Sequence, residues 1–127
     1  MMVVDTSALM AIVLNEPTST ACIAALEAEE RVLISAGTLA EALIVSAHRN
    51  VGQEVSRLVD ELSLEVVPVT SASARRIAAI YGRWGKGLHP AALNLGDCFA
   101  YAAAEDYDCP LLFVGDDFPK TEIQGVL

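Results

Sequence analysis

The sequence has few of the features that identify common classes of protein. Its three cysteines form no CxxC pair, so they support neither a disulfide framework nor a zinc site. No apolar run approaches the ~20 residues that a membrane span needs, and the N-terminus has no basic stretch typical of a signal peptide. A GxSxG motif is absent, which argues against a serine hydrolase. We therefore expect a cytoplasmic protein without a membrane partner.

Basic residues are also scarce. The chain has 8 Lys and Arg against 17 Asp and Glu, and its net charge is −9. Because nucleic-acid affinity depends mainly on neutralising phosphates, this average argues against a polyanionic partner. The charge is uneven, however, since residues 66–96 contain no acid but hold 4 of the 8 basic residues. If the protein holds RNA by charge and stacking, we expect these four to contact it: Arg75, Arg76, Arg83 and Lys86.

Apolar residues are abundant. They make up 54% of the 127 residues, and the mean hydropathy is +0.44. A chain of this length forms one domain, residues 1–127. So much apolar surface in a small domain predicts burial against a partner or a second copy, and we expect a homodimer.

Short apolar runs alternate with longer segments of helical periodicity. The expected strands are residues 3–4, 31–35, 64–69 and 111–115. The expected helices are residues 7–16, 17–30 with Pro17 in the first turn, 36–50, 52–63, 71–84 with a serine cap, and 96–108. This alternation predicts an α/β fold, with a central parallel sheet of four to five strands and helices on both faces. If the fourth strand returns to the free side of the first, a switch point lies between them.

Acidic residues follow the two strands that flank this switch point. Asp5 ends the first strand, and the pair Asp116 and Asp117 follows the fourth. Ligands bind at the carboxyl ends of such strands, so these carboxylates should meet in one crevice. Two further acids stand out: Glu41 in an apolar helix and Asp97 at a helix start. Each has an ordinary explanation, because Asp5 could cap a helix and Asp97 could complement a helix dipole.

The convergence of several acids needs a further explanation. Crowded carboxylates raise one another's pKa unless a cation neutralises them. Oxygen ligands select Mg²⁺ or Mn²⁺, and two such ions can clamp the reacting oxygens of a phosphodiester. The hydroxyls of Thr6 and Ser7 would orient Asp5 or a water on the metal. The pattern predicts hydrolysis without a protein nucleophile.

Four blocks of sequence carry a resemblance to a known family. They are VVDTSAL, TLAEA, HPAALNLGDCFAYA and LLFVGDDFPKTEI. In order and spacing they resemble the PIN-domain ribonucleases, in particular the VapC toxins of toxin–antitoxin pairs. The resemblance implies a PIN fold, RNA cleavage that depends on Mg²⁺ with Mn²⁺ as a substitute, and inhibition by a VapB-like antitoxin.

The family's acidic residues map onto this sequence one by one. The resemblance places the metal-binding and catalytic acids at Asp5, Glu41, Asp97 and the pair Asp116 and Asp117, and leaves open which member of the pair faces the metal. Asp5 and Asp97 would be central, while Glu41 would hold the metal or order a water on it. Asn94 would support the site together with Thr6 and Ser7, and Glu122 is a weaker candidate outside the first ring of ligands.

Two other functions compete with this interpretation. A catalytically silent PIN-like module would act only as a binding partner, but the complete set of acids argues against it. A phosphate-binding receiver of the response-regulator type would also place an Asp at a strand end. It would need a lysine late in the sheet, whereas Lys120 lies beyond the Asp pair, and it leaves Glu41 unexplained.

Overall fold

The computed structural model describes residues 1–127 and has a sheet of four strands in the order β3-β2-β1-β4. The strands are β1 (Met2–Val4), β2 (Val32–Ser35), β3 (Glu65–Val67) and β4 (Leu111–Leu112). Every neighbouring pair is parallel. The α/β class, the parallel sheet and the return of the last strand to the free side of the first are therefore confirmed.

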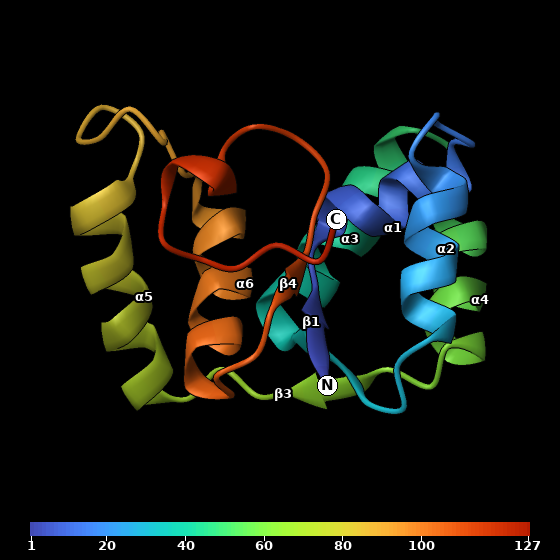
Figure 1. Ribbon diagram of the computed structural model, residues 1–127, viewed down its shortest axis with the longest axis horizontal. Coiled ribbons are helices and arrows are strands. Elements are labelled where there is room, and N and C mark those ends of the chain that lie inside the picture. The colour runs from blue at the N-terminus through green and yellow to red at the C-terminus, as the bar shows by residue number, and fades with distance from the viewer.

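Six α-helices and one 3-10 helix connect and flank the strands. They are α1 (Thr6–Val13), α2 (Ser19–Glu27), α3 (Ala36–His48), α4 (Gly52–Glu61), α5 (Ser71–Trp84), α6 (Leu95–Asp106) and η1 (Phe118–Lys120). Figure 1 shows α5 and α6 on one side of β1 and β4, and α1, α2 and α4 on the other. None of these helices has the length and apolar character needed to cross a bilayer.

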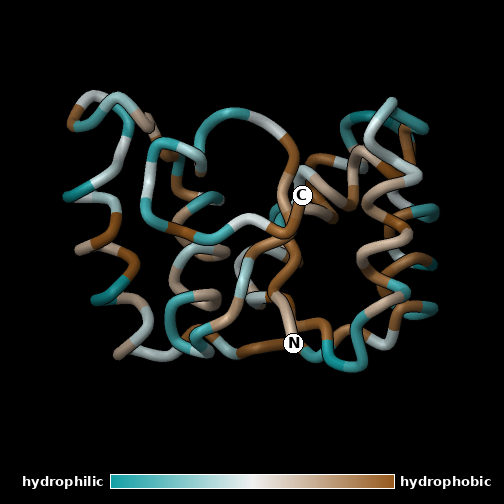
Figure 2. Tube along the Cα trace, in the orientation of Figure 1, coloured by the Kyte–Doolittle hydropathy of each residue, from teal (hydrophilic) through white to brown (hydrophobic).

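The alternation of side chains along the strands divides the core into two clusters. Val3, Leu33 and Leu111 pack with α5 and α6, whereas their neighbours Val4 and Ile34 pack with the helices of the opposite face. Successive strand residues point to opposite faces, so apolar runs such as these must be covered on both sides. Figure 2 shows hydrophobic residues along the central strands and hydrophilic ones in the loops at the periphery.

Most elements differ from the sequence prediction by a few residues at one end or both, and three of the differences concern how an element starts or stops. Helix α2 begins at Ser19, because Pro17 lies in a turn that Ser19 N–H closes on the Glu16 carbonyl. The cap of α5 is Thr70, whose hydroxyl accepts from Ser73 N–H in a capping box. Strand β4 has only two residues, since the chain leaves the sheet after Leu112.

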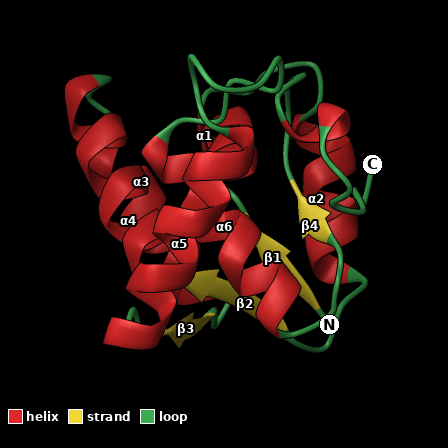
Figure 3. Cartoon of the chain, turned by 90° about the vertical axis from the view of Figure 1, so that its left-hand side faces the viewer, coloured by secondary structure: helices red, strands yellow, loops and turns green.

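The carboxyl ends of the strands feed directly into helices or into one long loop. Helix α1 follows β1 through Asp5 alone, and α3 follows β2 without a connecting residue. After β4 the chain forms a loop that reaches η1. Figure 3, seen from the side of α5 and α6, shows these loops gathered at the end of the molecule away from the N-terminus. The first turns of α1 and α6 and the middle of α3 are therefore close to the loop that follows β4.

Candidate active site

One cavity of about 320 Å³ lies at this edge of the sheet. Its wall contains all five acids predicted from the sequence and all three supporting residues: Asp5, Glu41, Asp97, Asp116, Asp117, Thr6, Ser7 and Asn94. These side chains come from β1, α1, α3, α6 and the loop after β4, which span more than 110 positions in the sequence. The topology therefore brings together acids that are distant in the chain.

Asp5 both caps α1 and contributes to the cavity. Its Oδ2 accepts from Ser7 N–H at 3.2 Å and from the Ser7 hydroxyl at 2.6 Å. The residue is only 3% exposed, so its Oδ1 is shielded from water, and yet this oxygen has no hydrogen-bond partner. Burial is the main cause that raises the pKa of Asp5 to about 6; the Ser7 hydrogen bonds oppose this rise and the charge of Glu41 adds to it. Capping thus accounts for the contacts of Oδ2 and leaves Oδ1 without a hydrogen-bond partner.

Glu41 lies half-buried on α3 and faces the start of α1. The Thr6 hydroxyl donates to its Oε1 at 2.6 Å. A partly buried glutamate among apolar neighbours needs a hydrogen-bond partner, because an unpaired buried charge is costly, and Thr6 is that partner. Ser7 therefore holds Asp5 while Thr6 holds Glu41, so the two adjacent hydroxyls orient two different acids.

Asp97 forms a capping box with Asn94 at the start of α6. Asp97 N–H donates to Asn94 Oδ1 at 2.8 Å, and Asp97 Oδ2 accepts from Asn94 N–H at 3.0 Å. Burial is the main cause that raises the pKa of Asp97 to about 7; the hydrogen bond from Asn94 opposes this, and the charges of Asp5, Asp117 and Glu41 add to it. Asp97 is thus a cap and also a member of the acidic cluster.

The two acids after β4 differ in their relation to the cluster. Both are exposed and both line the cavity. Of the two, Asp117 is the one whose charge is among the main causes of the raised pKa of Asp97. Glu122 lies elsewhere: it accepts from Tyr101 OH at 3.3 Å and from Arg83 at 3.2 Å, and it lines a different cavity. Glu122 therefore does not belong to the acidic cavity.

The donor set of the cavity fits a hard divalent cation. It consists of carboxylates, one of which has a buried oxygen without a partner, and the charges of these groups oppose one another's ionisation. In this structure no group of three or more His, Cys, Asp or Glu side chains is arranged to hold an ion. Instead, three of the carboxylates each accept a hydrogen bond from within the chain. The donors are Ser7 for Asp5, Thr6 for Glu41 and the Asn94 backbone N–H for Asp97.

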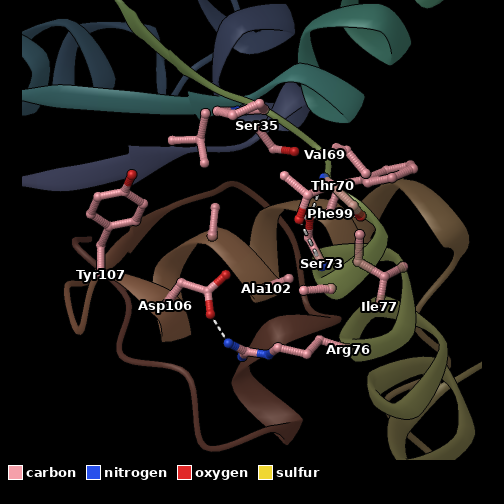
Figure 4. A pocket seen from close by; sticks show the side chains of 14 residues that line it. Ser35, Val69, Thr70, Ser73, Arg76, Ile77, Phe99, Ala102, Asp106 and Tyr107 are labelled. Carbon is pink, nitrogen blue, oxygen red and sulfur yellow. Dashed lines mark hydrogen bonds and ion pairs between the residues drawn. The ribbon is translucent and has the colours of Figure 1, made fainter.

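The predicted basic residues are not equivalent in the structure. Arg76 forms ion pairs with Glu105 and Asp106, and Arg83 pairs with Glu122 and stacks over the Trp84 ring. Figure 4 shows Arg76 reaching Asp106 at the wall of a separate cavity of about 350 Å³ between α5 and α6.

Arg75 and Lys86 are exposed and form no ion pair. Lys86 and Asn94 also line an apolar cleft of about 760 Å³, and Asn94 lines the acidic cavity as well. Lys86 therefore lies on a surface that adjoins the acids.

Comparison with known proteins agrees with this geometry. The family model described as "PIN domain" matches residues 2–124. Ribonuclease VapC36 of Mycobacterium tuberculosis is 43% identical over 127 residues, which cover 97% of this chain and 91% of that protein. The chain belongs to the PIN-domain family, among the VapC ribonucleases.

Solved structures show the same fold at lower sequence identity. The crystal structure of Mycobacterium tuberculosis VapC20, described as a toxin that cleaves the sarcin-ricin loop, superposes with a TM-score of 0.81 at 14% identity and covers 99% of this chain and 98% of its own. VapBC2 from Rickettsia felis, solved with a DNA fragment from its promoter, gives a TM-score of 0.69 at 16% identity, with 98% and 95% of the two chains covered. The predicted PIN-like fold is thus confirmed.

One contact in this PIN domain could not be found from the sequence. The Ser7 hydroxyl, which donates to Asp5, also accepts from Val114 N–H at 3.0 Å. It therefore connects the carboxylate after β1 to the backbone after β4, 107 positions away. The only signal in the sequence is a serine two residues beyond an aspartate, which is equally typical of an ordinary helix cap.

Proposed function

We propose that the acidic cavity is the active site of a metal-dependent endoribonuclease, and that residues 1–127 act as a single PIN domain, the toxin of a toxin–antitoxin pair. One observation carries this proposal. Acids that form no ion pair gather from four segments of the chain around a buried carboxylate oxygen of Asp5. The membership of the chain among the VapC ribonucleases supports the same reaction.

The residues of the cavity divide the work as follows. Asp5 and Asp97 hold the cation, because they are the most buried acids and their charged forms are the least stable without it. Glu41, held by Thr6, completes the ligand set or orders the attacking water. We assign the fourth acid to Asp117 rather than Asp116, since Asp117 is the one whose charge acts on Asp97.

We infer that the cation is Mg²⁺, with Mn²⁺ able to replace it, because the donors are hard carboxylate oxygens without His or Cys. When bound, a divalent ion activates water and stabilises the charge that develops on the phosphodiester. The two hydroxyls of the cavity, on Thr6 and Ser7, donate to carboxylates, so we take water as the nucleophile. The chain's contribution is to hold the acids in position through the Ser7, Thr6 and Asn94 hydrogen bonds.

A VapB-like antitoxin is the protein partner we propose. Two of the similar solved structures are a toxin–antitoxin complex from Klebsiella pneumoniae and the VapBC2 assembly of Rickettsia felis. An antitoxin arginine placed in the cavity would pair with its carboxylates, and such charge-assisted bonds are strong. Loss of cleavage when the antitoxin is added, together with tight co-purification, would support this role.

We also propose that the chain forms a homodimer. Ile44 on α3 and Leu95 on α6 are 60% and 59% exposed, and both lie next to residues that line the acidic cavity. Leu43 and Val45, on either side of Ile44, are exposed as well, and a cluster of large exposed apolar side chains favours burial against a partner. Sedimentation at micromolar concentration tests this, and a monomer there would contradict it.

RNA sequencing tests the proposed reaction most directly. After induced expression, the 5′ ends of cellular RNA should include new ends with the wild-type protein and lack them with Asp5→Asn. Identical ends with the two proteins would favour a silent binding module. A receiver is less favoured by the structure, because Lys120 lies on η1 and outside the acidic cavity. Labelling by a phosphoryl donor would revive that alternative.

A further inference from the structure

Helix α6 carries a buried glycine, Gly96, in its first turn, at the point where it passes Glu41 of α3. A Cβ atom added to Gly96 would overlap Cδ and Oε2 of Glu41 and would lie 2.6 Å from Oε1. Atoms that are not bonded to each other pack at about 3.5–4.0 Å. The Glu41 carboxylate therefore occupies the space in which any other residue at position 96 would place its side chain.

The same carboxylate is held from its other side. The Thr6 hydroxyl of α1 donates to Glu41 Oε1 at 2.6 Å, and this hydroxyl lies 3.4 Å from the Thr38 carbonyl oxygen. The Glu41 carboxylate thus lies between the hydroxyl of one helix and the bare backbone of another. It reaches the wall of the acidic cavity through this gap.

A second close approach between the same two helices shows what is unusual here. At Gly37 of α3, an added Cβ would overlap the ring of Phe99 from α6 and lie 2.7 Å from its Cε1. An apolar ring gains stability from such packing, so the core explains Gly37. A carboxylate gains none from a backbone carbon, and glycine weakens a helix relative to alanine. Packing and helix stability therefore do not explain Gly96.

We infer that Gly96 is a positioning residue that keeps the Glu41 carboxylate in the acidic cavity. This inference rests on the proposed function, since it assigns Gly96 a role toward the metal site. A methyl group at position 96 would meet the far end of a flexible side chain. Glu41 would rotate away and lose Thr6, while the backbones of α3 and α6 would remain in place. The fold should survive and the site should fail.

The test is Mn²⁺ affinity of the purified protein, measured by calorimetry, together with thermal melting. Gly96→Ala should weaken Mn²⁺ binding by about 10- to 100-fold, the range found when a residue that orients a metal ligand is lost. Its melting temperature without metal should be unchanged or higher. Gly52→Ala is the matched control, because Gly52 also lies at a helix start and an added Cβ there has no neighbour closer than 3.7 Å. It should bind Mn²⁺ as the wild type does.

A double variant identifies the route of the effect. Glu41→Ala alone should weaken Mn²⁺ binding, and adding Gly96→Ala to it should cause no further loss. A full additional loss in that background would overturn the inference, and so would wild-type affinity in Gly96→Ala alone. If Gly96→Ala fails to fold, the double variant should fold again; failure of both would also overturn it. Unchanged Mn²⁺ affinity in Glu41→Ala would also overturn the inference, because Gly96 could then not act on the metal through Glu41. No Mn²⁺ binding by the wild type would instead overturn the proposed metal site.

Discussion

The two ends of α6 place acids in opposite environments. At the end of the helix, Glu105 and Asp106 are paired with Arg76 beside the cavity of Figure 4. At its beginning, Asp97 faces Asp5 and their acidic neighbours, and none of the five acids of that cavity forms an ion pair. The first group shares the chain's own Arg76 as a common ion-pair partner. The second is left with a charge that only a group from outside can balance.

This difference indicates which acids are available for function. An acid beside an arginine adds at most about 1 kcal/mol at an exposed site and has little affinity left for another cation. Crowded acids without a partner instead have raised pKa values, as Asp5 and Asp97 do. A bound cation stabilises the charged carboxylates and so offsets the free-energy cost of ionising them. Stability and binding are therefore linked at one end of α6 and not at the other.

The largest expected effect is the difference in RNA cleavage between two variants, one from each group of acids. Asp5→Asn should lower RNA cleavage by orders of magnitude, because it removes a charge from the ligand set, whereas Asp106→Asn should leave cleavage unchanged. Asn still caps α1, so Asp5→Asn should fold and gain stability without metal.

Melting curves with increasing Mn²⁺ check the two halves of this prediction. A ligand at 100 times its Kd stabilises a protein by about 2.7 kcal/mol, so the wild type and Asp106→Asn should shift strongly and Asp5→Asn much less. Equal stabilisation and equal cleavage by Asp5→Asn and the wild type would reduce Asp5 to a helix cap.

A smaller effect is expected in the pH dependence of stability without metal. The pKa values of Asp5 and Asp97 are raised from 3.8 to about 6 and about 7, so the folded state holds more protons than the unfolded state between these values. The free energy of unfolding should therefore fall as pH rises from about 4 to about 7. Each unit of pKa shift corresponds to ~1.4 kcal/mol, so the loss should reach several kcal/mol for the two groups together.

Urea unfolding at several pH values measures this loss. Saturating Mn²⁺ should remove it, because the bound cation keeps both carboxylates ionised, and Asp97→Asn should reduce it. Stability that rises over the same interval without metal would contradict the raised pKa values.

Much of the fold and of the acidic cavity could be predicted from the sequence. The order of strands follows from hydrophobic periodicity and from right-handed crossovers, and it places Asp5 and Asp117 at one edge. Glu41 and Asp97 also stand out in the sequence, and the resemblance to a family implies that they belong to the same site. Hydrogen bonds between distant residues were beyond prediction, since the contact from Val114 N–H to Ser7 depends on the register of β1 and β4.

Close approaches and ion pairs were also beyond the sequence. The role of Gly96 depends on how closely α3 and α6 cross, and nothing local in the sequence fixes that distance. In the sequence, the four basic residues of 66–96 cannot be told apart, because they share one acid-free stretch. Helix α5 nevertheless turns Arg76 toward Asp106 and leaves Arg75 exposed, which only the packed structure reveals.

The smallest effect concerns how RNA is held, and it separates the two kinds of basic residue. Lys86→Gln and Arg75→Gln should each weaken RNA binding and reduce the slope of log affinity against log salt by about 0.7, the value for one phosphate contact on a single strand. Arg76→Gln and Arg83→Gln should change the slope less, because these side chains must first leave their acidic partners.

Fluorescence titration of a labelled RNA with the Asp5→Asn protein avoids cleavage during the measurement. If all four substitutions reduce the slope equally, the ion pairs of Arg76 and Arg83 open readily on binding, and the contrast between the two ends of α6 weakens. An unchanged slope in all four would mean that the RNA follows another surface. The favoured outcome would place the RNA path along Lys86 toward Asn94, where the wall of the acidic cavity begins.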